Sequence, residues 1–335
     1  TLPRICIVMM KRALRGATAF FAGLLLCQCN HSISSFGGQR AKNLKMMGYV
    51  PVPLQKVSDD ARFSGFFEVN GEPLRFLIDS GANSTDLESD IATRVGIRRN
   101  PAIKVVTRGA LGREIRSGHG RGTLRVGPMQ AEDFPFTIAP NATRETSTSR
   151  YAGQVGLDAL DATGALIDIP SGRMWIPGPE SNRATSRIAK PLGLRRGLGQ
   201  KALRMGKAGR LPHLILHGTM DTKHTSWVVD TGAEISVMAT ESYARFGFPS
   251  VATNSQMVDA SGDRIALRRG KLTDLVFGDV NIRSFNIAIA PLLEVRKFFL
   301  DPTGRPVDGI LGMDFLINGQ ALIDSGSRIL YMGKP

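Results

Sequence analysis

The chain has 335 residues, 42% hydrophobic and 21% charged, proportions that are ordinary for a globular protein of about two domains. Its 37 glycines and 18 prolines favour turns over long helices, which argues against a coiled coil, a collagen-like fibre and a multi-span membrane protein. A formal net charge of +14 predicts attraction to anionic surfaces, with nucleic acid, acidic lipid and acidic substrate equal candidates on charge alone.

The N-terminal region has the layout of an export signal. A basic start is followed by an apolar run that ends at Cys27 and is too short to span a bilayer comfortably. We therefore predict a signal peptide or membrane anchor over residues 1–30, a linker over 31–48, and an exported protein that is periplasmic or envelope-associated in a bacterium. A buried N-terminal helix is the disfavoured alternative. Cys27 or Cys29 is a candidate for lipidation, although the small residue expected before an acylated cysteine is missing.

An internal repeat organises the rest of the chain. The segment FLIDSGANST around Asp79 matches WVVDTGAEIS around Asp230, an offset of 230 − 79 = 151 that three further matches share. Two later matches are separated by 156 positions, so the order is kept with one change of length. This pattern indicates two copies of one module. We predict copy one over residues 49–180, a basic linker over 181–210 and copy two over 211–335.

Each copy consists of short apolar runs divided by turn residues. GFFEVNGEPLRFLID has two such runs joined by Asn70-Gly71, the usual signal for a β-hairpin, and residues 211–230 repeat the pattern. One short helix per copy is expected, in LESDIATRV and in ATESYARF, where the apolar spacing shifts towards the helical period. The linker is read as a solvated connector, with an anionic docking strip or a processing site as the alternative. The body should be all-β with minor helix.

In both copies an apolar run ends in Asp, a hydroxyl residue and Gly: Asp79-Ser80-Gly81 and Asp230-Thr231-Gly232. A carboxylate at the end of a buried strand is costly unless it is hydrogen-bonded or paired with another titrating group. One such aspartate would be read as a turn residue that bonds its own backbone. Two at equivalent places favour a pseudo-twofold pairing that brings the carboxyl groups face to face. Such a pair shares one proton, so one member acts as a base and the other as an acid, without metal or cofactor.

These segments resemble the retropepsin-like aspartic proteases, and the exported bacterial members more closely than pepsin. The match covers nearly all of both copies: the Asp-Ser/Thr-Gly-Ala turn, a helix that ends near Gly, a glycine-containing hairpin, and a late apolar-apolar-Gly before x-D-x-L. The resemblance implies a bilobal aspartic-protease fold of two tandem retropepsin-like β-barrel domains. It also implies an aspartic endopeptidase with Asp79 and Asp230 as catalytic residues and an extended polypeptide as substrate.

Further roles follow from the same resemblance. In the family each hydroxyl of the turn bonds the opposite strand, a role that falls to Ser80 and Thr231. The rest of the catalytic turns would be Gly81, Ala82, Gly232 and Ala233. The segment that packs under the turns would contribute Val155, Gly156, Leu311 and Gly312, with Gln154 where an aliphatic residue is expected. Flaps, the hairpins that close over substrate, would span residues 106–122 and 258–270. Residues placed to contact substrate would be Asn83, Glu234, Gly112 and Gly262.

The alanines after each Asp-Ser/Thr-Gly triplet bear on the pH range. Ala82 and Ala233 stand where pepsin-like enzymes usually have a hydroxyl that donates to the carboxylate. Loss of a donor to the charged form raises the apparent pKa values of the pair. We therefore predict activity that reaches towards mildly acidic or neutral pH.

Other patterns carry less weight. Asp324-Ser325-Gly326 is a third Asp-Ser-Gly triplet, but it aligns with Asp168 late in the module and is predicted to be a strand-end turn. His213 and His217 stand four apart without the glutamate of a metalloprotease motif, so no metal is predicted. Nucleic acid is not a predicted partner, because no aromatic-plus-basic signature accompanies the 7% of aromatic residues.

Three readings stay open. The first alternative to an enzyme is a catalytically silent peptide- or envelope-binding protein of the same fold, which Gln154 mildly favours. The second is an obligate dimer in which copies pair between chains, in place of a monomer with an intramolecular pair of aspartates. The third is contact of the basic surface with an anionic membrane or envelope component.

Overall fold

The computed structural model describes residues 7–10, 40–56, 61–141, 151–179, 181, 201–208, 211–259, 261–301 and 303–333. Strand β1 (Ile7–Met10) is the described part of the predicted export signal. The rest of that signal, the linker up to residue 39 and residues 182–200 of the basic linker lie outside the described residues. Among the described residues, no helix combines the length and the apolar character that crossing a bilayer requires.

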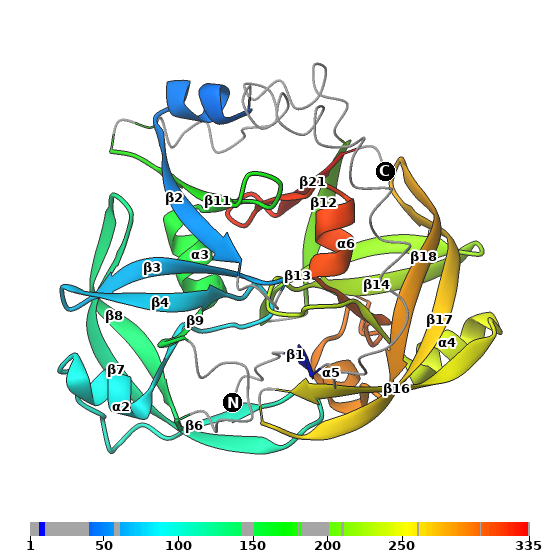
Figure 1. The fold of residues 1–335 in the computed structure, drawn as a ribbon, viewed down its shortest axis with the longest axis horizontal. Helices are drawn as coiled ribbons and strands as arrows, with labels where there is room; N and C mark the ends of the chain where they lie inside the picture. The colour runs from blue at the N-terminus through cyan, green and yellow to red at the C-terminus, as the bar shows by residue number, and fades with distance from the viewer. Residues whose placement is uncertain are drawn as a thin grey trace, which may run out of the picture.

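Copy one is built from short strands with two short helices after the helical residues 40–46 (Figure 1). Its elements are β2 (Tyr49–Lys56), β3 (Phe63–Val69), β4 (Glu72–Ile78), β5 (Asp86–Glu88), α2 (Ser89–Arg94), β6 (Val105–Arg108), β7 (Glu114–Val126), β8 (Met129–Ala139), β9 (Gly153–Val155), α3 (Leu157–Thr163), β10 (Leu166–Asp168) and β11 (Arg173–Pro177).

Copy two repeats this order and adds one helix, α5. Its elements are β12 (Lys201–Ala208), β13 (Leu211–Met220), β14 (Lys223–Val229), β15 (Val237–Ala239), α4 (Thr240–Phe246), β16 (Ser250–Asp259), β17 (Arg264–Phe277), β18 (Val280–Ala290), α5 (Leu293–Phe298), β19 (Gly309–Leu311), α6 (Met313–Asn318), β20 (Leu322–Asp324) and β21 (Ile329–Met332).

The expected hairpin and the expected helix after the Asp-Ser/Thr-Gly turn are present in both copies. Asn70 and Gly71 join β3 to β4 with φ values of 51° and 85°, the left-handed pair that a tight two-residue hairpin turn requires. Helices α2 and α4 form in the segments predicted for them. The expectation of only one helix per copy was wrong, because α3 and α6 follow β9 and β19, and each begins directly after a glycine.

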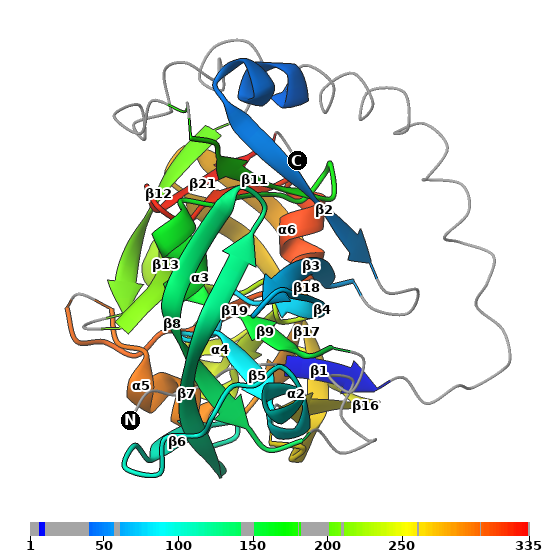
Figure 2. The ribbon, with the colours of Figure 1, turned by 90° about the vertical axis from the view of Figure 1, so that its left-hand side faces the viewer.

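A six-stranded antiparallel sheet joins the two copies. Its order is β2, β11, β10, β20, β21, β12, with β10 and β20 paired at the centre so that Ile167 lies opposite Ile323. The prediction of a connector up to residue 210 was wrong for residues 201–208, because they form β12 and complete this sheet. Pairing with β21 satisfies backbone N–H and C=O groups of this segment, although its composition alone does not predict a strand. Figures 1 and 2 show this sheet at one end of the molecule, with β6 and β16 at the other.

The hydrophobic core is continuous between the copies. Trp227 of β14 and Ile78 of β4 belong to one buried cluster that includes residues from nearly every strand. A separate cluster under the six-stranded sheet contains Trp175 and Tyr331. The first cluster contains Ile78 and Val229, the last residues of β4 and β14, and so fixes the strand ends that precede the two aspartates.

Candidate active site

Asp79 and Asp230 start tight turns directly after β4 and β14. Both side chains are fully buried. Strands β9 and β19 run parallel to β4 and β14 and support each turn from one side. The N–H of Asp79 donates to the carbonyl of Val155 (3.0 Å), and the N–H of Asp230 donates to the carbonyl of Leu311 (3.0 Å).

The two turns face each other across the contact between the copies. A Cβ atom on Gly81 would lie 2.4 Å from Cγ of Asp230, and one on Gly232 would lie 2.4 Å from Cγ of Asp79. Only glycine leaves room for the opposing carboxyl group at these two positions. The structure therefore brings together the two aspartates that lie 151 residues apart in the sequence.

The hydroxyl residues cross-link the turns reciprocally. Oγ of Ser80 donates to the carbonyl of Val229 (2.9 Å) and accepts from the N–H of Thr231 (3.0 Å). Oγ1 of Thr231 donates to the carbonyl of Ile78 (2.9 Å) and accepts from the N–H of Ser80 (3.0 Å). Each hydroxyl thus satisfies two buried backbone groups, both of them in the opposite copy.

A second tier of residues, Thr85 and Gly156 in copy one and Ser236 and Gly312 in copy two, links each turn to the start of α3 or α6. The N–H of Gly156 donates to Oγ1 of Thr85 (3.1 Å), and the N–H of Gly312 donates to Oγ of Ser236 (2.9 Å). A Cβ atom on either glycine would come within 2.7 Å of the turn backbone. Gln154, two residues before Gly156, is also buried.

Asp158 and Asp314 complete this tier, although the sequence assigned them no role beyond the repeat. Oδ1 of Asp158 accepts from the N–H (2.8 Å) and the hydroxyl (2.7 Å) of Thr85. Oδ1 of Asp314 accepts from the same two groups of Ser236, at 2.8 and 2.6 Å. Burial raises the pKa of both carboxyls, against the lowering effect of these donors.

The environment of the facing aspartates disfavours charge. Burial raises the pKa of both groups, and the neighbouring charge of Asp230 raises the pKa of Asp79 further. Among the residues that the structure describes, Oδ1 of Asp230 accepts from two N–H groups, those of Gly232 (2.7 Å) and Ala233 (3.2 Å), and Oδ1 of Asp79 from one, that of Gly81 (2.8 Å). These donors favour the charged form, so Asp230 is the more acidic member of the pair.

Two buried side chains near the turns were missed by the sequence analysis. Arg62 and His213 are related by the same offset, 213 − 62 = 151, and that equivalence was the available signal. Nη1 of Arg62 lies 3.5 Å from the carbonyl oxygen of Gly232, and Nε2 of His213 lies 3.0 Å from that of Gly81. Each copy therefore reaches across to the turn of the other.

The charges of this pair differ. Burial lowers the pKa of His213 to about 3, so the imidazole is neutral at ordinary pH. Arg62 is only 1% exposed and keeps its charge, because an arginine does not deprotonate in proteins. That charge lowers the pKa of both Asp79 and Asp230, against the stronger effect of burial.

The predicted flaps are hairpins whose tips meet. Strands β6 and β7 form one and β16 and β17 the other. Gly112 and Gly262 lie at the tips with φ values of 99° and 83°, which other residues adopt only with strain. Oδ2 of the buried Asp259 accepts from the N–H of Leu111 (2.8 Å) and so links the two tips.

The remaining predicted residues differ between the copies. Asn83 is 5% exposed and Glu234 is half-buried, and each directly follows the alanine of its turn in the sequence. A cavity of 510 Å³ lies in copy two, lined by residues that include Ile235, Arg268 and Arg269. The third Asp-Ser-Gly triplet ends β20 in the six-stranded sheet, where a strand-end turn was predicted.

Comparisons with known proteins find an aspartyl protease sequence profile on each copy. The sequence profile described as gag-polyprotein putative aspartyl protease matches residues 66–160, and the profile described as aspartyl protease matches residues 216–315. Among solved structures, the crystal structure of basic 7S globulin from soybean is similar, with a TM-score of 0.50, 9% identity, and coverage of 86% of this chain and 95% of that chain. No curated protein gave a significant sequence match.

The order of the strands and the structural match define a bilobal aspartic-protease fold. With one profile on each copy, the chain belongs to the retropepsin-like aspartic protease family.

Proposed function

We propose that this protein is an aspartic endopeptidase whose single active site is formed by Asp79 and Asp230. The observation that carries the proposal is the close approach of each carboxyl group to the glycine of the opposite turn. A Cβ atom added to either glycine would lie 2.4 Å from Cγ of the opposing aspartate. Two buried carboxyls at this contact share one proton, since ionising both is costly. The site then holds a base and an acid at once.

The hydrogen bonds favour Asp230 as the ionised member. Its carboxylate takes a proton from a bound water, and the resulting hydroxide oxygen attacks the peptide carbonyl carbon. Asp79 donates its proton to the carbonyl oxygen, which gives a neutral tetrahedral intermediate. Asp230 then returns its proton to the leaving nitrogen while Asp79 recovers one from the intermediate, and the C–N bond breaks. Both carboxyls end as they began.

An extended polypeptide suits the edge of the copy-two flap. Strand β1 pairs antiparallel with β16, with Met9 opposite Met257, so this edge accepts a strand through backbone hydrogen bonds. Peptide recognition by strand addition uses the same bonds and sorts side chains into alternating pockets. We extend the proposal to export, on the basic-then-apolar order of the N-terminal sequence.

The test is cleavage of a mixed peptide library across pH by the full chain and by Asp79→Asn and Asp230→Asn. Each substitution should lower the cleavage rate by at least about 1,000-fold, because it removes the acid or the base of the pair. The matched control is Asp324→Asn, which changes the third Asp-Ser-Gly triplet, lies in the six-stranded sheet and should cleave normally. Unchanged cleavage by either active-site variant would overturn the assignment of the catalytic pair. No cleavage by a folded wild type at any pH would replace the proposal with the binding alternative.

The charge of Arg62 predicts a shift in the pH profile. Its guanidinium favours the ionised form of both aspartates, so Arg62→Met raises both pKa values. Both limbs of the kcat/KM profile should move to higher pH by about half a unit. Arg94→Met, which removes an exposed arginine on α2, should leave the profile in place. A profile that stays fixed in Arg62→Met would show that this charge does not act on the pair.

A further inference from the structure

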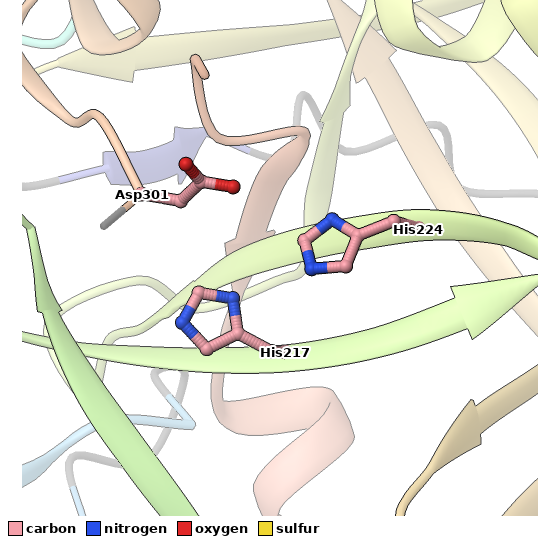
Figure 3. A group of neighbouring side chains, drawn as sticks. All are labelled: His217, His224 and Asp301. Carbon is pink, nitrogen blue, oxygen red and sulfur yellow. The ribbon is translucent and has the colours of Figure 1, made fainter. Parts of the chain in front are cut away.

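A second cluster of ligating side chains lies in copy two, outside the aspartate pair (Figure 3). His217 comes from β13, His224 from β14 and Asp301 from the loop after α5. One nitrogen or oxygen atom from each of the three lies within 4.8 Å of the others. Sequence spacing does not reveal this group, because Asp301 is brought in from 77 residues beyond His224, 301 − 224 = 77.

Strand register places the two imidazoles on one face. In the β13–β14 hairpin, Thr219 lies opposite His224 and His217 lies opposite Ser226. Alternate residues of a strand share a face, so His217 and His224 are diagonal neighbours on the same side. Figure 3 shows both rings directed into the space between the hairpin and Asp301.

The carboxyl group of Asp301 is held in place by its own loop. Oδ1 accepts from the N–H of Thr303 (2.8 Å) and the N–H of Arg305 (3.0 Å). Oδ2 lies 3.4 Å from Oγ of Ser226, which is itself 3.1 Å from Nδ1 of His217. One carboxylate oxygen is thus fixed by the turn and the other faces the histidine side of the cluster. Hydrogen bonds of this kind orient metal ligands in known sites.

We propose that His217, His224 and Asp301 bind a divalent transition-metal ion of the zinc class. Two imidazoles and one carboxylate are a donor set that Zn²⁺ accepts, with water in a fourth position. Ligands around a tetrahedral zinc lie about 3.3 Å apart at bond lengths of about 2 Å. Rotations of the side chains must therefore close the present separations by up to about 1.5 Å.

Arg305 competes with a metal ion for the carboxylate of Asp301. Its Nε lies 3.6 Å from Oδ2 of Asp301 and donates to Oγ1 of Thr303 (3.0 Å), but its side chain is 57% exposed, so it can be displaced into solvent. The site is also specific to copy two, because the positions 151 residues earlier are Phe66 and Pro73, which have no ligating atom in their side chains. It is therefore an addition to the duplicated module.

The metal would clamp the Asp301 loop to the hairpin that carries His213. His213 and His217 lie on the same face of β13, and the ring of His213 packs edge-on against Phe299 at 4.2 Å. Nε2 of His213 contacts the carbonyl of Gly81, so this loop adjoins the support of the copy-one turn. Binding of the ion should stabilise the folded chain, because the unfolded chain does not hold the three ligands together.

The test is titration of the EDTA-treated full chain with Zn²⁺, followed by calorimetry, and with Co²⁺, followed by visible absorption. We expect one equivalent of bound metal, a tetrahedral cobalt spectrum and a rise in the thermal midpoint with zinc concentration. His224→Ala and Asp301→Asn should each weaken binding by at least about 100-fold. Arg305→Gln should tighten it several-fold.

The control is His119→Ala, which removes a histidine of β7 outside the cluster and should leave binding unchanged. Far-UV circular dichroism of every variant separates a lost ligand from a lost fold, and His217→Ala serves as a second ligand variant if one of the others does not fold. The proposal is overturned by the absence of stoichiometric binding to the folded wild type. It is equally overturned by binding that the three ligand variants share with wild type, since surface histidines elsewhere would then hold the ion.

Discussion

Gly232→Ala should abolish peptide cleavage while most of the fold survives. The added Cβ would lie 2.4 Å from Cγ and Oδ1 of Asp79, a separation that requires the opposing carboxyl group to move. A displacement of about 1 Å in reacting groups costs about 100-fold in rate, and here the base and the acid are displaced relative to each other. We expect a loss of cleavage of at least about 100-fold, measured as kcat/KM on the best peptide from the library.

The chain supplies a matched control in its third Asp-Ser-Gly triplet. A Cβ on Gly326 would meet its nearest heavy atom, Cα of Gly164, at 3.3 Å, so Gly326→Ala asks for a movement of only a few tenths of an ångström. Its activity should stay close to wild type. If Gly232→Ala cleaves as fast as Gly326→Ala, the two carboxyl groups do not depend on the close approach of the turns.

The features predicted correctly from sequence are those encoded locally and then repeated. Asn70-Gly71 identifies a hairpin because few residues adopt two successive left-handed conformations. Asp79 and Asp230 could be paired because the same triplet recurs at a constant offset. In both cases the signal lies within a few residues, and the repeat adds the long-range relation.

Features that depend on the other copy were missed. Residues 201–208 have a connector's composition, and they become a strand because β21 offers an unpaired edge. Arg62 and His213 occupy equivalent positions of the repeat but differ in type, so they form no recognisable shared motif, yet each contacts the opposite turn. A sequence pattern reports the conformation that a segment prefers, whereas these roles come from the residues that the segment contacts after folding.

The asymmetry of the site also comes from residues that contact the turns only after folding. The copies have equivalent turns, but copy one contributes a buried cation, Arg62, where copy two contributes the neutral His213. The N–H donors also differ, with two on Asp230 and one on Asp79. A symmetric pair would leave the proton equally shared, and these differences favour ionisation of Asp230 first.

Thr231→Val should cost more stability than any other isosteric change in the turns. Valine keeps the volume but removes a hydroxyl that donates to Ile78 and accepts from the N–H of Ser80. Both backbone groups are buried, and each one left unsatisfied costs about 1–3 kcal/mol. The free energy of unfolding should therefore fall by about 2–6 kcal/mol, out of the roughly 5–15 kcal/mol typical of a folded protein. Denaturation by urea, followed by tryptophan fluorescence, measures this loss.

Thr231→Ser is the matched control, because it keeps the hydroxyl and loses only a methyl group. Its unfolding free energy should lie within about 1.5 kcal/mol of wild type. Ser80→Ala should resemble Thr231→Val, since Oγ of Ser80 bonds the carbonyl of Val229 and the N–H of Thr231 in the same way. In the double variant the two losses should be non-additive, because each hydroxyl bonds the backbone of the other residue. Strict additivity, or equal stability of Thr231→Val and Thr231→Ser, would mean that these hydroxyls do not hold the two copies together.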